Sequence, residues 1–344
     1  MRKTFTYRSA SAFAALALAG ASATACSSGE QDSAGPSATG PNSDSSVLAT
    51  TSVWADVAAA VTGAQVEAII SGTDIDPHHF EPSAKDLARV READTLVANG
   101  GPYDASLYTV AEQDRIISAI PLVSKEEAEA HSHEHEHAHG DGENHGHDHD
   151  HSHDHDSTPG NLDDLEHAWF STEKVKQVAS ALKEKVGGST EDVDTRMDAV
   201  NQKLAELPHT HVAMTEPIAA PLVWGTELHE ITPEGYMRSA INEADPSVQD
   251  VAAFLDEIKA GHIDILIANP QSTNSATEQL TNAARENNVA IVEMRETPPE
   301  GVNFLDYFDQ VVDQLVDAVN SLPQDGNDDT HDHGDPHYDE EHAA

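Results

Sequence analysis

Short apolar runs alternate with amphipathic stretches in two blocks of the chain, one on each side of a long polar tract. Apolar runs of about four to eight residues are typical of buried strands, and apolar positions spaced three and four residues apart predict helices. The strand patterns cover residues 47–51, 66–71, 95–98, 115–120, 211–215, 264–268 and 289–294. The helical patterns cover residues 53–61, 83–93, 103–113, 171–186, 190–207, 247–260, 274–286 and 303–322.

This alternation predicts a parallel α/β architecture in both blocks. We expect an N-terminal lobe over 47–189 and a C-terminal lobe over 208–323, each a parallel sheet with flanking helices. The helix over 190–207, which ends before Pro208, would join the two lobes. Ligands of such folds bind beyond the carboxyl ends of the strands, so candidate site residues are sought there.

The first 25 residues read as a secretory signal peptide. Arg2, Lys3 and Arg8 form a positive region, and a short apolar stretch follows that ends in small residues. Cys26, the single cysteine, comes directly after Ala25 and fits a bacterial lipidation site. The alternative is an ordinary cleavage that leaves an unpaired thiol. We favour lipidation, with residues 26–46, rich in Ser, Gly, Pro and Asp, as a disordered tether to the membrane surface.

The charge of the chain narrows the classes of partner. Its 62 acidic residues outnumber its 18 Lys and Arg, giving a formal net charge of −44. Nucleic-acid binding needs Lys and Arg to neutralise phosphates, so that class is excluded. Acidity alone usually means only solubility, but the 22 histidines point towards cations.

Half of the histidines lie in one tract inside the polar segment 125–160, which we expect to be a disordered loop. Eleven of them alternate mostly with Asp, Glu or Ser, an arrangement with strong affinity for zinc, copper or nickel but no single defined site. These are His131, His133, His135, His137, His139, His145, His147, His149, His151, His153 and His155. The tail over 324–344 carries four more histidines, and for it a purely solubilising role is an equal alternative.

A few side chains near predicted strand ends are candidate ligands. His78 lies in a loop between the strand over 66–71 and a helix start at Ser83, where it could bind a metal. His167 precedes a helix and stands beside Trp169, a setting in which a histidine is more often structural. Glu216 and Glu296 each follow a strand of the second lobe, and each alone could be a solvated loop acid. The H-x-E spacing of His79 and Glu81 lacks the cysteines that a zinc deaminase needs.

Taken together, these segments resemble the zinc- and manganese-binding lipoproteins that serve as solute-binding subunits of ABC importers. Asp76-Pro77-His78 to Glu81-Pro82 is similar to the first-ligand loop of that family, and Glu166-His167-Ala168-Trp169 to its second-ligand motif, with Leu165-Glu166 in place of Asp-Pro. Glu216 falls at the third ligand position and, with a small gap, Glu296 at the fourth. The histidine tract lies between the first two ligands, as in many zinc members.

The resemblance implies two α/β lobes joined by a long rigid helix, with the metal in the cleft between them. It implies a metal site made of His78, His167, Glu216 and Glu296. His79 would then be an alternative ligand or support a ligand, although an exposed loop histidine is the favoured reading, and Glu81 could orient a ligand imidazole. The implied partners are the membrane permease and, through Cys26, the membrane surface, with the protein itself a monomer. The remaining histidines are excluded from the cleft because they lie near strand starts or on the surface: His209, His211, His229 and His262.

Two features disagree about the metal. Two carboxylates suit Mn²⁺ or Fe²⁺ as well as Zn²⁺, whereas the imidazole-rich tract favours Zn²⁺, which also binds nitrogen and oxygen ligands more tightly than Mn²⁺ does. We expect zinc, with manganese as the alternative. A surface metallohydrolase is disfavoured because no G-x-S-x-G occurs and no predicted helix carries H-E-x-x-H. An adhesin or a simple metal store would need only the histidine tracts.

Overall fold

The computed structural model describes residues 46–72, 80–127, 165–242 and 244–323. Among the predicted features, the signal peptide, Cys26, the tether, His78, His79, the histidine tract and the C-terminal tail lie outside these ranges. None of the described helices is both long enough and apolar enough to cross a membrane.

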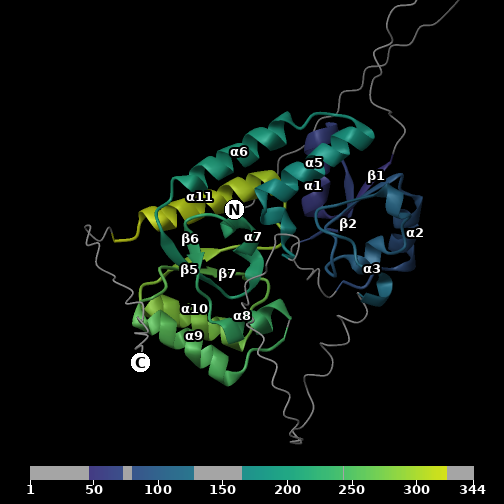
Figure 1. The fold of residues 1–344 in the computed structure, drawn as a ribbon. Helices are drawn as coiled ribbons and strands as arrows, with labels where there is room; N and C mark the ends of the chain where they lie inside the picture. Colours follow the sequence, from purple (N-terminus) through teal and green to yellow (C-terminus); the bar gives the residue numbers. More distant parts are fainter. Residues whose placement is uncertain (1–45, 73–79, 128–164, 243, 324–344) are drawn as a thin grey trace, which may run out of the picture. The chain divides into compact units, whose positions relative to one another are not determined.

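The first half of the described chain forms a four-stranded parallel sheet (Figure 1). The strand order is β2-β1-β3-β4, so the chain reverses its direction of winding between β1 and β3. Buried apolar side chains fill these short strands, which explains why the sequence shows them as apolar runs. The strands are β1 (Val47–Thr51), β2 (Glu67–Ile70), β3 (Thr95–Ala98) and β4 (Ile116–Ser118).

The second half repeats the same topology. Its four parallel strands have the order β6-β5-β7-β8, which places the change of winding direction between β5 and β7. In open α/β sheets, this point at the carboxyl ends of the strands is where ligands bind. The strands are β5 (Thr210–Met214), β6 (Leu228–Glu230), β7 (Ile265–Ala268) and β8 (Ala290–Glu293).

Helices cover both faces of each sheet. One large apolar core takes side chains from both halves, while each sheet has a smaller core on its other face, packed against α2 and α3 in the first half and α8 to α10 in the second. The helices of the first half are α1 (Ser52–Thr62), α2 (Ala84–Glu92), α3 (Ala105–Tyr108) and α5 (Thr172–Val186). Between the halves and in the second are α6 (Glu191–Ala205), α7 (Ala220–Val223), α8 (Glu234–Ile241), α9 (Val248–Ala260), α10 (Ser275–Glu286) and α11 (Phe304–Asn320).

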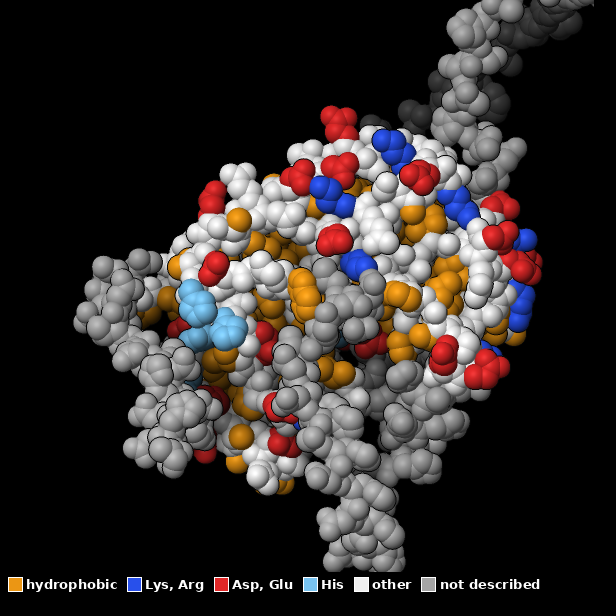
Figure 2. All heavy atoms as spheres, in the orientation of Figure 1, with side chains coloured by type: hydrophobic (Ala, Val, Ile, Leu, Met, Phe, Trp, Pro, Cys, Tyr) orange, Lys and Arg blue, Asp and Glu red, His pale blue; other side chains and the backbone are white. Residues whose placement is uncertain are grey.

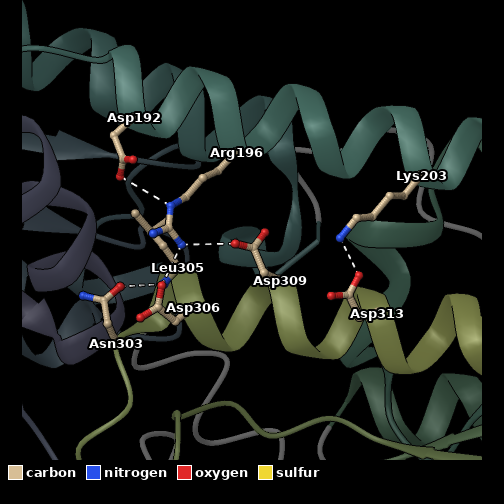
Figure 3. Close-up of polar contacts among 8 residues, drawn as sticks. All are labelled: Asp192, Arg196, Lys203, Asn303, Leu305, Asp306, Asp309 and Asp313. Atoms are coloured by element: carbon tan, nitrogen blue, oxygen red, sulfur yellow. Dashed lines mark hydrogen bonds and ion pairs between the residues drawn. The ribbon is translucent and has the colours of Figure 1, made fainter.

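Helices α6 and α11 lie side by side and run in the same direction (Figures 1 and 3). Arg196 of α6 contacts Asp306 at 2.7 Å and Asp309 at 3.1 Å, and one α6 turn back it contacts Asp192 at 3.4 Å. Further along, Lys203 pairs with Asp313. Helix α11 is therefore held against α6 by ion pairs along both helices.

Helix α11 also contacts the first half of the chain. The carboxylate of Asp56, on α1, accepts a hydrogen bond of 2.7 Å from the backbone N–H of Phe304, and Asn303 caps the same helix end through Leu305. Phe304 and Phe308 then pack against Phe170, with ring centroids 6.2 and 5.6 Å away. Helix α11, which follows the second sheet in the chain, thus packs against the first half as well.

The predicted parallel α/β architecture is confirmed, and most elements match to within a few residues. The helix predicted over 103–113 is wrong, because only Ala105–Tyr108 is α-helical. The hydroxyl of Tyr108 donates to the carbonyl of Gly101 at 2.6 Å and accepts from the N–H of Val123 at 3.0 Å. These tertiary contacts favour a compact turn over continuation of the helix.

Candidate metal site

The second sheet places two polar residues at its change of winding direction. Glu216 comes two residues after β5 and Asn269 directly after β7, so both lie at the carboxyl ends of neighbouring strands. The hydroxyl of Thr215 accepts a hydrogen bond of 3.3 Å from the N–H of Asn269, which ties the two strand ends together. Glu296 follows β8 at the same edge of the sheet.

His167 approaches from the other half of the chain. It stands at the start of a short 3₁₀ turn over Ala168–Phe170, which leads into α5, and only 4% of it is exposed. Its ring packs edge-on against Trp169, with centroids 5.2 Å apart, and lies 6.4 Å from the ring of Tyr103. Packing on both aromatic rings restricts the imidazole to one orientation.

The structure brings His167, Glu216 and Glu296 together. One ligand atom from each lies within 4.8 Å of the other two, although the residues come from separate segments of the chain. Glu296 is 5% exposed and Glu216 is partly buried, so neither is the solvated loop acid considered above. One imidazole and two carboxylates in this arrangement are a typical ligand set for a divalent metal.

Asn269 holds the two carboxylates near each other. Its amide nitrogen donates to Glu216 at 2.6 Å and to Glu296 at 3.2 Å. Its amide oxygen accepts from the N–H of Gln271 at 2.9 Å, and this contact fixes which way the amide faces. Ser272 donates to the other oxygen of Glu216. Two buried carboxylates this close repel each other, so the pair favours a cation between them.

Tyr103 connects Glu296 with the first half of the chain. Its hydroxyl donates to Glu296 at 3.1 Å, and its ring packs against Trp169 with centroids 5.0 Å apart. Burial, followed by the negative charges of Glu296 and Glu166, raises the pKa of Tyr103 well above its ordinary value. The hydroxyl therefore remains a hydrogen-bond donor to this carboxylate at neutral pH.

A buried hydrogen-bond network positions the segment that carries His167. The side chain of Asn99, directly after β3, donates to the carbonyl of Glu166 at 2.7 Å. Asp104 accepts in turn from the N–H groups of Asn99 at 2.7 Å and Gly100 at 3.0 Å, and from the hydroxyl of Thr50 at 2.6 Å. Burial raises the pKa of Asp104 to about 6, and these hydrogen bonds oppose that rise.

The structure brings only some of the predicted site residues together. His167, Glu216 and Glu296 converge, whereas His78 and His79 lie outside the described residues. Glu81 is exposed, just before the capping box that Ser83 and Asp86 form at the start of α2. The sequence reading missed the contacts that support the site, which come from Asn99, Tyr103, Asp104, Asn269 and Ser272.

Asn269 and Asn99 could have been found from the sequence. Each comes directly after a buried strand, as Glu216 and Glu296 follow theirs within a few residues, and the same rule about carboxyl ends applies to them. Tyr103 carries no such signal, because its role depends on contacts with Trp169 and Glu296, far away in the sequence.

A protein-family model matches most of the chain. The model described as "Zinc-uptake complex component A periplasmic" matches residues 47–318, most of the chain. The chain belongs to this family. ZnuA-family members are metal-binding components of ABC importers that act outside the cytoplasm, and they are solute-binding proteins rather than enzymes. No curated protein matches the chain in a sequence comparison.

Solved structures share the fold at low sequence identity. A crystal structure of ZnuA is 14% identical, covers 80% of this chain and 99% of its own, and superimposes with a TM-score of 0.54. The periplasmic zinc-binding protein TroA from Treponema pallidum is 14% identical, with 79% and 98% coverage and a TM-score of 0.55. The solute-binding protein FpvC from Pseudomonas aeruginosa, in complex with Mn²⁺, is 15% identical, with 80% and 98% coverage and a TM-score of 0.54. FpvC has also been solved with Ni²⁺.

Proposed function

We propose that this ZnuA-family protein captures Zn²⁺ outside the cell membrane and delivers it to the permease of an ABC importer. The observation that carries the proposal is the convergence of His167, Glu216 and Glu296 from both halves of the chain. An ion bound there contacts both sheets at once, so binding is coupled to the arrangement of the two halves.

The proposed ligand set is His167, Glu216 and Glu296 with His78 as the fourth member. His78 is assigned from the resemblance of its loop to the first-ligand loop of the family. Four protein ligands complete a tetrahedral shell and leave no position for an activated water. Such a site binds and releases an ion without catalysing a reaction, in keeping with a solute-binding protein.

Zinc is preferred over manganese for two reasons. Two imidazoles and two carboxylates bind Zn²⁺ more tightly than Mn²⁺ in the order of divalent affinities. The histidine tract would collect Zn²⁺ near the site as an auxiliary loop, and imidazoles give Mn²⁺ little advantage. The pair of carboxylates favours Mn²⁺ as the alternative cargo, and the complex of FpvC with Mn²⁺ shows that a protein of this fold can take that ion.

Delivery requires the protein to stay near the permease. Lipidation of Cys26 would anchor it to the outer face of the membrane, and residues 27–46 would act as the tether. A monomer suffices, because one chain supplies the complete ligand set.

Chelator competition in solution tests the metal site. The full chain is titrated with Zn²⁺ against a chelator of known affinity, beside the variants His78→Ala, His167→Ala and Glu296→Gln. We expect each variant to lose at least about tenfold in affinity for the tightest ion, because a ligand or its charge is removed. The matched control is His262→Ala. His262 is exposed and contacts Glu257 at 2.7 Å, remote from the three ligands, so its loss should leave the affinity unchanged.

Two further experiments test the alternatives of a metal store and of manganese as the cargo. Deleting residues 125–158 should preserve one tight Zn²⁺ per chain. If tight binding disappears with the tract, the protein is a metal store and the proposed site is wrong. Competition between Zn²⁺ and Mn²⁺ on the same protein identifies the cargo, and preferential retention of Mn²⁺ would replace zinc by manganese in the proposal.

A further inference from the structure

Three histidines gather at the amino-terminal end of the second sheet. His211 is in β5 and His229 in β6, and they are register partners in the parallel pairing of these strands. Register partners point to the same face of a sheet, and His209, which directly precedes β5, lies next to both of their rings. Strand β6 is at the edge of its sheet. Figure 2 shows histidine side chains gathered at one place on the visible surface.

The three imidazoles have the geometry of ligands around one ion. The Nε2 atoms of His209 and His211 are 3.3 Å apart, and one ring nitrogen from each histidine lies within 4.8 Å of the other two. Two nitrogens bound to one tetrahedral zinc are separated by about 3.3 Å, given a zinc–nitrogen distance of about 2.0–2.1 Å. Ring centroids 5.0, 5.6 and 5.7 Å apart show that the three rings meet as one cluster.

We infer that His209, His211 and His229 form a second metal site, which takes Zn²⁺ or another divalent ion that prefers imidazole nitrogen. The geometry favours an ion over a hydrogen-bonded cluster of rings, because a neutral imidazole has only one N–H to share and three nitrogens face one another here. A metal ion between the rings accepts the lone pair of one nitrogen from each histidine, so all three nitrogens gain a partner.

The ligand set distinguishes this site from the one formed by His167, Glu216 and Glu296. The group contains no carboxylate, so it selects against Mn²⁺ more strongly than a site with two glutamates does. Three protein ligands leave a fourth position open, and His209 and His229 are exposed, so water or a ligand from outside can reach the ion. The site exchanges its ion freely, in contrast to a closed four-ligand site.

The two sites are too far apart to share an ion. His211 and Glu216 lie near opposite ends of β5, five residues apart, which corresponds to about 16 Å along an extended strand. Occupation of one site can therefore be measured with the other disabled. The second site also differs from the histidine tract, because its ligands come from two paired strands and exist together only in the folded protein.

Residue-resolved chemical modification tests the site in the full chain. Diethylpyrocarbonate reacts with accessible imidazole nitrogens, and mass spectrometry of peptides reports each histidine separately from the tract. We expect Zn²⁺ to protect His209, His211 and His229 together, with one common midpoint, while Mn²⁺ at the same concentration protects none of them. His262, exposed but outside the cluster, should react at the same rate with and without Zn²⁺.

Variants decide whether the three act as one site. In His229→Gln, a change at an exposed position, the protection of His209 and His211 by Zn²⁺ should be lost, and His211→Gln should remove that of the other two. In His167→Ala, which disables the cleft, the protection of all three should be unchanged. Protection with separate midpoints, or protection that survives His229→Gln, would show that the histidines bind independently or not at all. Either result overturns the second site and leaves the cleft proposal standing.

Discussion

Asp104 is a buried carboxylate that supports the proposed metal site without belonging to its ligands. It accepts hydrogen bonds from Thr50, Asn99 and Gly100, and Asn99 in turn holds the carbonyl before His167. The ionised carboxylate of Asp104 therefore holds this network together at neutral pH, although burial disfavours its negative charge.

This conflict predicts a pH dependence of stability. Because burial raises the pKa of Asp104 from 3.8 to about 6, the folded protein holds a proton between these values that the unfolded chain releases. The contribution of Asp104 to the free energy of unfolding therefore falls by up to about 3 kcal/mol as the pH rises from 4 to 6, and is constant above that. Urea denaturation of wild type and Asp104→Asn should show that the difference between their free energies of unfolding decreases from pH 4 to pH 6.

Asp86→Asn is the matched control for that measurement. Asp86 is partly exposed, and its hydrogen bonds with Ser83 lower its pKa, so its effect on stability changes only below about pH 4. The difference between wild type and Asp86→Asn should show no decrease between pH 4 and 6. A flat profile for Asp104→Asn as well would mean that Asp104 keeps its ordinary pKa in the fold.

At the residue scale, three residues of the candidate site could be predicted from the sequence. Glu216 and Glu296 could be selected because they follow buried strands, and His167 through the family motif that surrounds it. Their convergence depends on how the two halves pack, which no local pattern encodes. For the same reason, His209, His211 and His229 read separately as surface residues, and the register of β5 with β6 is what unites them.

At the scale of elements, the turn after β3 depends on Gly100. A Cβ atom at this position would lie 2.2 Å from the carbonyl oxygen of Ile120, and the backbone φ of +94° disfavours any side chain. We expect Gly100→Ala to destabilise the protein by about 2–4 kcal/mol in urea denaturation, because the turn must shift away from β4.

Gly63→Ala separates the cost of the steric contact from the cost of the positive backbone φ. Gly63 ends α1 with a φ of +69°, yet a Cβ there would meet nothing within 4 Å. Only the backbone cost of about 1–2 kcal/mol remains. Equal losses for the two variants would show that the contact with Ile120 relaxes easily.

The pairing of α6 with α11 gives a prediction that depends on salt. Arg196 contacts Asp192, Asp306 and Asp309, and its loss leaves three carboxylates facing one another. Arg196→Met should lower the free energy of unfolding by about 1–2 kcal/mol at low salt. The loss should be smaller at 1 M salt, where the Debye length is about 3 Å and the ion pairs are screened. Lys203→Met removes a single contact, with Asp313, and should cost less. A loss for Arg196→Met that is independent of salt would assign its effect to packing of the side chain.

Elements were predicted well wherever their signal was local. The helix that begins after Ser83 has its capping box in the sequence, and β3 is a fully buried apolar run. The helix predicted over 103–113 failed because the contacts that shorten it connect Tyr108 with Gly101 and Val123. Periodicity records which residues can form a helix and not which contacts interrupt it.

For the whole molecule, metal binding should raise thermal stability. An ion held by His167, Glu216 and Glu296 contacts both halves of the folded chain, and these ligands are dispersed when the chain unfolds. At a free Zn²⁺ concentration of 100 times the dissociation constant, the gain is about 2.7 kcal/mol, or about 5–10 °C in Tm. The comparison is calorimetry with Zn²⁺ against excess chelator.

The histidine tract does not confound this measurement. Its histidines are neighbours in the sequence and are present in the unfolded chain too, so we expect any Zn²⁺ that they bind to be bound in both states and to add little to the shift. Glu296→Gln should abolish most of the rise in Tm. A full rise in that variant would mean that the stabilising ion binds elsewhere.

The bond between Asp56 and Phe304 has a consequence for biosynthesis. It joins residues 248 positions apart, and α11 adds Phe304, Phe308, Val311, Val312 and Leu315 to the core that both halves share. The core that both halves share stays incomplete until α11 has been synthesised, and pairings over such distances form slowly. A chain that works outside the cytoplasm must cross the membrane first. We expect this late completion of the core to keep the chain unfolded while it crosses the membrane, so that folding finishes on the side where the protein acts.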